Sequence, residues 1–185
     1  PAFMDNKRAI LANPAVEYIR AALAVIEKDF SYEAVFRLLK GYMCSINRDE
    51  VDIFENYVLA LGIRGYKRYN EPFRRRFPSK REMDMDMVNA VRTKLCELME
   101  PLYKVFHDEN SHVSDYIDAL NTFLDENGVY EKLLDLKEQM ETEHQAAAAK
   151  EYGQCYGDII ELFEQTRKLL GDEKMSIRGF SDVLD

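Results

Sequence analysis

Helix-start and helix-stop signals recur along almost the whole chain, and they constrain the fold more than any other feature of the sequence. Asn13 stands directly before Pro14, and proline is favoured at the first position of a helix because that position needs no backbone N–H. From there apolar residues recur at helical spacing to about Lys28. Capping residues and glycines delimit similar apolar stripes elsewhere. Further helices are expected over residues 31–41, 47–62, from about 85 onward, 114–127, 130–170 and 176–184.

Two places in this helical pattern are expected to be interrupted. Pro101 must break or kink its helix, because proline removes a backbone hydrogen bond and collides with the preceding turn. The 130–170 stretch is expected to break near Gly153 or Gly157, although its middle, EHQAAAAKEYGQ, could instead be a helix end followed by a loop. PAFM, at the start, is the only segment that could form a strand, and it has no pairing partner. The expected fold is all-α, an irregular helical bundle that allows one short orphan strand at the N-terminus.

Composition favours one globular domain with neither a membrane span nor a disulfide framework. The chain has 185 residues, 46% of them apolar and 32% charged, which is ordinary for a globular protein. No apolar run approaches the roughly 18 residues that a membrane span needs, and we find no signal peptide. Cys44, Cys96 and Cys155 lie far apart without a CxxC pair, so we expect reduced thiols in a cytoplasmic protein. Since the chain starts at Pro1 and stops inside an expected helix, we expect a piece excised from a longer protein.

Residues 55–77, ENYVLALGIRGYKRYNEPFRRRF, begin as an apolar helix and end in a dense basic segment. Pro72, Pro78 and the absence of an apolar period predict a loop over residues 63–82, which we call the basic loop. Between positions 64 and 81 there are eight basic residues and one acidic residue, a charge of +7, whereas the other positions hold 17 basic and 33 acidic residues, a charge of −16. The eight cations are Arg64, Lys67, Arg68, Arg74, Arg75, Arg76, Lys80 and Arg81.

The basic loop interleaves its cations with the aromatic rings of Tyr66, Tyr69, Phe73 and Phe77. Nucleic-acid sites use this combination, because cations neutralise phosphates and release counterions while rings stack on bases. The eight cations are therefore candidate DNA-phosphate contacts, and Tyr66, Tyr69 and Phe73 are candidate stacking or anchoring rings. Two alternatives stay open: the loop could dock on the acidic helices of the same protein, or it could be a solvated loop without a role.

The sequence shows no catalytic or metal-binding pattern. In HDENSH, His107 and His112 do not have the HExxH spacing and would lie on different faces of a helix, so we expect a solvated helix end and no metal. The many carboxylates fall mostly on polar helix faces or in first turns, where they interact with the helix dipole. Phosphate-binding GxxxxGKS or GxxxxGKT, GxGxxG and GxSxG motifs are absent. We therefore expect no catalytic residue and no bound cofactor in this chain.

Three segments carry a resemblance to a known family: FSYEAVFRLLK at 30–40, ENYVLALGIRG at 55–65 and YNEPF at 69–73. In this order and at this spacing they resemble the B subunit of the bacterial AddAB (RexAB) ATP-dependent helicase–nuclease. PAFMDNKRAILANPAVEYIRAAL at the start and LLGDEKMSIRGFSDVLD at the end also fit, whereas residues 82–150 match only in character. The family often has tryptophan where this chain has Tyr69, so an aromatic ring is kept there.

The resemblance implies a place within a large two-subunit machine that processes DNA double-strand breaks for recombinational repair. Residues 1–28 would form the edge of a helicase 2A-like region with a stretch like helicase motif IV, and residues 29–185 a helical 2B-like subdomain with the basic loop. A nucleotide contact could map near Lys7 or Arg8. ATP, magnesium and an iron–sulfur cluster would be bound elsewhere in the parent. The implied partners are DNA and the A subunit of the helicase–nuclease heterodimer, with no membrane.

Two hypotheses follow for the function of the chain. In the first, it is a non-catalytic helical fragment of the helicase–nuclease, and the basic loop guides DNA or the helices hold the partner subunit. In the second, it is an architectural or protein-interaction module whose basic loop packs on acidic helices or on the partner chain. Exposed cations without carboxylate partners would favour the first hypothesis, and cations paired with neighbouring carboxylates would favour the second.

Overall fold

The computed structural model describes residues 13–76 and 84–185, and all regular secondary structure within these ranges is helical, which confirms the all-α prediction. The segment expected to form an orphan strand, residues 1–4, lies outside the described residues. The helices are α2 (Pro14–Glu27), α3 (Tyr32–Leu39), α4 (Arg48–Leu61), α5 (Tyr66–Tyr69), α6 (Met85–His107), α7 (Val113–Glu126), α8 (Val129–Thr142), α9 (Ala146–Leu170) and α10 (Ile177–Leu184).

Local capping explains where most of these helices begin. The side-chain oxygen of Asn13 accepts a hydrogen bond from the backbone N–H of Ala15 (3.0 Å), and that of Asn47 accepts from Asp49 (2.8 Å). Ser31 and Ser176 cap α3 and α10 in the same way. These contacts satisfy backbone N–H groups that have no partner inside the helix, so the predicted starts at these four caps are confirmed.

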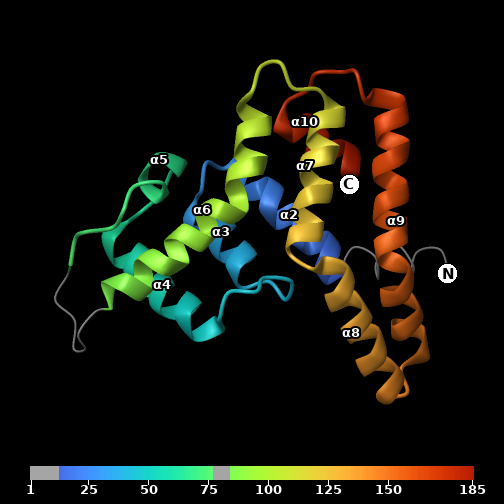
Figure 1. The fold of residues 1–185 in the computed structure, drawn as a ribbon, viewed down its shortest axis with the longest axis horizontal. Coiled ribbons are helices and arrows are strands. Elements are labelled where there is room, and N and C mark those ends of the chain that lie inside the picture. The colour runs from blue at the N-terminus through green and yellow to red at the C-terminus, as the bar shows by residue number, and fades with distance from the viewer. Residues whose placement is uncertain (1–12, 77–83) are drawn as a thin grey trace.

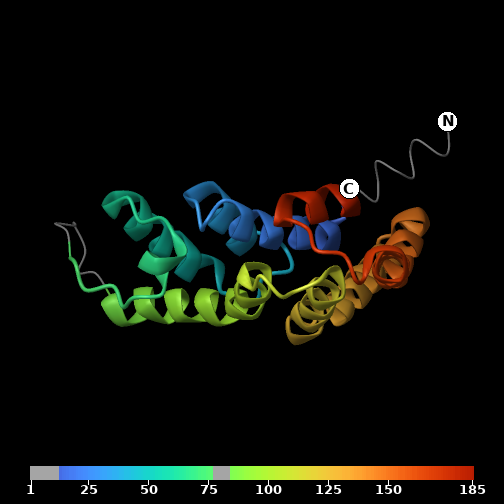
Figure 2. The same ribbon diagram turned by 90° about the horizontal axis from the view of Figure 1, so that it is seen from above.

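The helices form an irregular bundle around one continuous core. Figure 2 shows α2 and α10 on one side of the molecule and α6 and α7 on the other. Helix α2 contributes eight buried residues to the core. Helices α8 and α9 pack side by side as an antiparallel pair, and residues 143–145 connect them (Figure 1). No described helix is long and apolar enough to cross a membrane. The predicted division of the chain at residue 28 stays a prediction.

Helix α6 runs without a break through Pro101, although its axis bends part-way along (Figures 1 and 2). The predicted break is therefore absent, and the helix that contains Pro101 is bent, as a proline kink would make it. Proline costs α6 one backbone hydrogen bond and adds a local clash. Met99 and Leu102, on either side of Pro101, are fully buried, and the free energy of burying them keeps both halves of the helix in place.

The break in the 130–170 stretch does not lie at Gly153 or Gly157, because both residues are inside α9. Helix α8 ends at Thr142, and His144 adopts a left-handed conformation (φ 58°) that reverses the chain. The alternative that this segment contains a helix end and a loop is confirmed for residues 143–145. The four alanines that follow already belong to α9, as their high helix propensity allows.

Replacing Gly157 by alanine is expected to raise the free energy of unfolding by about 1 kcal/mol, because glycine is a poor helix former and a Cβ atom at this position would meet no atom within 4 Å. The matched control is Gly62→Ala. Gly62 ends α4 in the left-handed conformation (φ 59°), so alanine should lower stability by about 1 kcal/mol there. Urea denaturation followed by circular dichroism measures both changes. Equal effects of the two substitutions would contradict the placement of Gly157 inside a helix and of Gly62 at a left-handed helix end.

Candidate nucleic-acid interface

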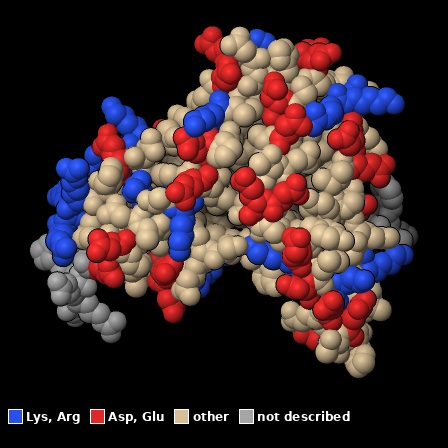
Figure 3. Space-filling view, viewed as in Figure 1, with Lys and Arg blue, Asp and Glu red and all other residues tan. Residues whose placement is uncertain are grey.

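The described part of the basic loop, residues 63–76, presents its cations to solvent. Figure 3 shows Lys and Arg side chains gathered at the end of the molecule formed by α5 and the segment after it. Lys80 and Arg81 lie outside the described residues. The six described candidates all have exposed side chains: Arg64, Lys67, Arg68, Arg74, Arg75 and Arg76.

Five of these cations form no ion pair with any described carboxylate: Arg64, Lys67, Arg68, Arg74 and Arg75. Other cations of the protein do find such partners. The guanidinium of Arg37 lies 2.7 Å from Glu17, and Lys104 lies 2.7 Å from Glu100. The alternative that the basic loop docks on acidic helices through its own charges thus gains no support from the described residues.

The described part of the loop contains one short helix, α5. The described aromatic residues of the loop, Tyr66, Tyr69 and Phe73, are half-buried or buried, and Phe77 lies outside the described residues. Tyr69 is fully buried, Phe73 is 9% exposed and Tyr66 is half-buried. The Tyr69 ring lies 5.6 Å from the Phe30 ring and 6.3 Å from the Phe54 ring, between centroids. Since Tyr69 and Phe73 have almost no exposed surface, we assign them the anchoring role and exclude them from base stacking.

Tyr66 takes part in a second ring arrangement that reaches the surface. Its ring stacks on Tyr103 with centroids 3.6 Å apart, and Tyr103 stacks on the exposed His107 at 4.0 Å. His107 Nδ1 lies 2.8 Å from the carbonyl oxygen of Tyr103. The sequence analysis expected His107 to be a solvated residue at a helix end and did not identify Tyr103. Within the described residues no three side chains of the metal-binding types come together.

Side chains from other helices hold the backbone at both ends of α5. Asp29, in the turn after α2, accepts a hydrogen bond from the backbone N–H of Tyr66 (2.9 Å). The carbonyl oxygen of Tyr69 accepts hydrogen bonds from Arg92 of α6 (2.9 Å) and from the thiol of Cys96 (3.2 Å). These contacts satisfy backbone N–H and C=O groups at the ends of α5, which a four-residue helix is too short to pair internally.

Asn89 of α6 holds the segment after α5 in the same way. Its amide oxygen accepts from the backbone N–H of Phe73 (2.8 Å), and its amide nitrogen donates to the carbonyl oxygen of Phe73 (2.9 Å). Two residues later, the hydroxyl of Tyr57 donates to the carbonyl oxygen of Arg75 (2.7 Å). Asp29, Asn89 and Arg92 were missed from the sequence, because a polar residue on an amphipathic helix or in a turn is normally expected to face solvent.

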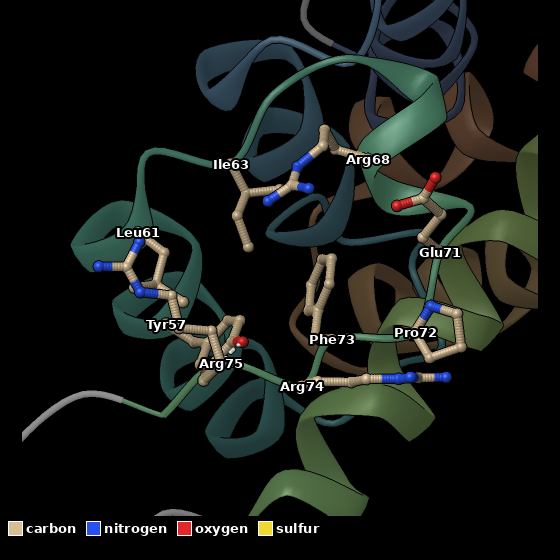
Figure 4. A pocket seen from close by; sticks show the side chains of 9 residues that line it. All are labelled: Tyr57, Leu61, Ile63, Arg68, Glu71, Pro72, Phe73, Arg74 and Arg75. Carbon is tan, nitrogen blue, oxygen red and sulfur yellow. Dashed lines mark hydrogen bonds between the residues drawn. The ribbon is translucent and has the colours of Figure 1, made fainter.

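A pocket of about 420 Å³ lies between the C-terminal part of α4 and the segment after α5 (Figure 4). The Arg68 side chain extends toward the space between Ile63 and Phe73, Arg75 extends toward Leu61, and Arg74 extends in the opposite direction past Pro72 (Figure 4). The pocket is lined by Tyr57, Leu61, Ile63, Arg68, Glu71, Pro72, Phe73, Arg74 and Arg75.

Two charged residues of the pocket lining affect the pKa of the Tyr57 hydroxyl. Burial raises the pKa of the Tyr57 hydroxyl, whereas the positive charges of Arg68 and Arg75 act to lower it. Tyr57 therefore stays protonated at neutral pH and keeps its hydrogen bond to the Arg75 carbonyl. Two guanidinium groups of the pocket lining thus lie close enough to the Tyr57 hydroxyl to influence its pKa.

The cysteines offer no reactive group near this site. All three are free thiols, and burial raises the pKa of each, that of Cys155 to about 12. A thiol with a raised pKa is protonated at neutral pH and is a poor nucleophile and metal ligand. The Cys96 thiol, which contacts the basic loop, is therefore protonated at neutral pH.

Comparison with known proteins gives relatives over the whole chain, although no family model matches it. The chain is 37% identical over 188 residues to the B subunit of the ATP-dependent helicase/deoxyribonuclease of Lachnoclostridium phytofermentans. It is 34% identical over 192 residues to the protein of the same name from Clostridium botulinum and 31% over 193 residues to that from Thermoanaerobacter pseudethanolicus. The chain spans 16–17% of the length of these relatives.

Proposed function

The chain belongs to the family of ATP-dependent helicase/deoxyribonuclease B subunits, of which it matches one segment, and from this premise we propose that it is a non-catalytic helical module that contacts DNA phosphates through the basic loop. One observation carries the proposal: five exposed cations lack carboxylate partners among the described residues and project from a backbone that neighbouring helices hold in place.

The charge distribution supports a DNA contact confined to this end of the molecule. The segment from 64 to 81 has a charge of +7 and the other residues a charge of −16. Cations that bind phosphates release condensed counterions, which favours association, whereas acidic surfaces elsewhere repel a polyanion. A duplex or a single strand is thus directed to the basic loop and away from the other helices.

The proposal extends to the longer protein only through its relatives. Their names describe an ATP-dependent enzyme that acts as a helicase and deoxyribonuclease and has more than one subunit. We propose that a protein containing this chain works in the same way, in the cytoplasm, on DNA ends that enter recombinational repair. ATP, magnesium, an iron–sulfur cluster and the A subunit would then bind outside the basic loop.

Contact with another protein is a second candidate function, and exposed apolar side chains on α9 and α10 favour it. Leu169 of α9 is 79% exposed, and Leu162 on the same helix and Val183 of α10 are also exposed. Large apolar side chains without cover are common at protein interfaces. These side chains lie on α9 and α10 and not in the basic loop, so a protein contact through them is compatible with DNA binding.

The triple substitution Arg64→Gln, Lys67→Gln and Arg74→Gln is expected to weaken DNA binding at least about tenfold at low salt. The reason is the loss of three phosphate contacts, each of which contributes roughly 0.7–0.9 to the slope of log affinity against log salt. We expect the slope to become shallower by about 2–3. Fluorescence anisotropy with a labelled oligonucleotide at several salt concentrations measures both quantities.

The matched control for this experiment is the triple substitution Lys150→Gln, Lys168→Gln and Arg178→Gln. These side chains are exposed on α9 and α10, and their replacement changes the net charge by the same amount. We expect the control to keep the wild-type slope. Equal losses in the two variants would show that only net charge matters, and the absence of salt-dependent binding in the wild type would refute the proposal.

A further inference from the structure

We propose that the pocket between α4 and the segment after α5 holds one unpaired nucleotide of a single DNA strand, with its phosphate bound by Arg68 and Arg75. The inference rests on the proposed DNA contact and specifies which form of DNA the basic loop prefers. The surface cations of the basic loop thus border a pocket with a defined lining and volume.

The size of the pocket suits a single nucleotide. Its volume of about 420 Å³ falls in the usual range for small-molecule sites, roughly 300–1,000 Å³. A base within a duplex could enter only after it leaves its stack and its partner, which costs a few kcal/mol, whereas a single strand has no such cost. Duplex DNA can therefore reach the outer cations of the basic loop but not the pocket.

The charged side of the pocket suits a phosphate. Arg68 and Arg75 both line the pocket, are exposed and form no ion pair with a described carboxylate. Arg68 extends toward Phe73 and Arg75 toward Leu61, so they flank the pocket from two sides (Figure 4). A planar guanidinium can donate two parallel hydrogen bonds to phosphate oxygens, and its flat face can also stack on a base. Surface cations without such a cavity would bind the backbone of either form of DNA equally well.

The apolar side of the pocket suits a sugar and a base. Leu61 and Ile63 lie on one side and Pro72 on the other, with Phe73 between them (Figure 4). A site with apolar walls and a few convergent charged groups is typical of pockets that bind one small ligand unit. Glu71 is the one carboxylate in the lining, and its charge opposes a phosphate.

The pocket is also formed before any ligand arrives. Asn89 fixes both backbone groups of Phe73, and the hydroxyl of Tyr57 fixes the carbonyl group of Arg75. The backbone that carries Arg75 therefore does not need to be ordered when a nucleotide binds. Avoiding this entropic cost increases affinity without any additional contact.

The test compares a labelled oligothymidylate with a blunt duplex of the same length by fluorescence anisotropy. We expect the wild-type chain to bind the single strand about tenfold or more tightly than the duplex. Arg68→Gln with Arg75→Gln should remove this preference. Arg64→Gln with Lys67→Gln, outside the pocket, should weaken binding of both forms and leave their ratio unchanged. Glu71→Gln should tighten binding of the single strand.

A second measurement locates the ligand independently of affinity. Titration with deoxythymidine 5′-monophosphate should shift the NMR signals of Ile63 and Phe73, and inorganic phosphate should shift them much less. If both arginine pairs change the ratio equally, or the mononucleotide shifts no pocket signal, the inference is overturned while the proposed DNA contact stands. If neither form of DNA binds in a salt-dependent manner, the proposed function fails as well.

Discussion

Replacing Tyr69 by alanine is expected to lower the free energy of unfolding by about 3–5 kcal/mol. Tyr69 is fully buried and its ring contacts those of Phe30, Phe54 and Phe73, so the substitution leaves a cavity where three elements meet. Domains of this kind have total stabilities of about 5–15 kcal/mol, and the loss is thus a large part of the whole. Urea denaturation followed by circular dichroism measures it.

Tyr69→Phe is the matched control, because it keeps the ring and removes only the hydroxyl. That hydroxyl is buried and has no hydrogen-bond partner among the described residues, and burial raises its pKa, so it stays protonated. Its removal should be neutral or should stabilise the fold by up to about 1–2 kcal/mol. A loss of less than about 1 kcal/mol in Tyr69→Ala would contradict the anchoring role.

The ends of the helices could be predicted because the groups that cap them are close in the sequence. Ser31 accepts a hydrogen bond from Ala34, and Gly62 ends α4 through its own left-handed conformation. Neither interaction needs a distant partner, so the sequence contains the necessary information. The turn at His144 was harder to place, because histidine rarely adopts a left-handed conformation and the nearby glycines were stronger break signals.

The interior of the basic loop could not be predicted, because it depends on contacts over long sequence distances. Tyr69 packs against Phe30, 39 residues earlier in the chain, and Phe73 is held by Asn89, 16 residues later. The sequence shows alternating rings and cations, and this alternation is equally compatible with rings that face solvent. Only the fold determines that the rings turn inward while the cations stay outside.

Substitution of the buried rings and substitution of the exposed cations should have different effects on stability and on affinity. Rings in the core fix the backbone, and a fixed backbone holds the guanidinium groups at constant positions. In the proposed DNA contact the anchoring residues act without touching DNA, and their substitution should affect stability first and affinity second. Direct phosphate contacts should show the opposite order, since exposed cations contribute little to stability.

Replacing Asn89 by alanine is expected to lower the free energy of unfolding by about 2–4 kcal/mol and to loosen the segment that carries the arginines. The side chain satisfies the N–H and C=O groups of Phe73 and also donates to the carbonyl oxygen of Met85 (2.9 Å). Phe73 is buried, so its backbone groups would lose these partners without full access to water.

Hydrogen exchange of the Phe73 amide is the sharpest measurement of this effect, because local opening sets the exchange rate. We expect faster exchange in Asn89→Ala and a several-fold weaker affinity for single-stranded DNA, since the pocket would have to be ordered on binding. Asn70→Ala is the control: Asn70 is exposed in the same loop and its side chain forms no hydrogen bond with a described residue. Unchanged exchange at Phe73 in Asn89→Ala would contradict the role assigned to Asn89.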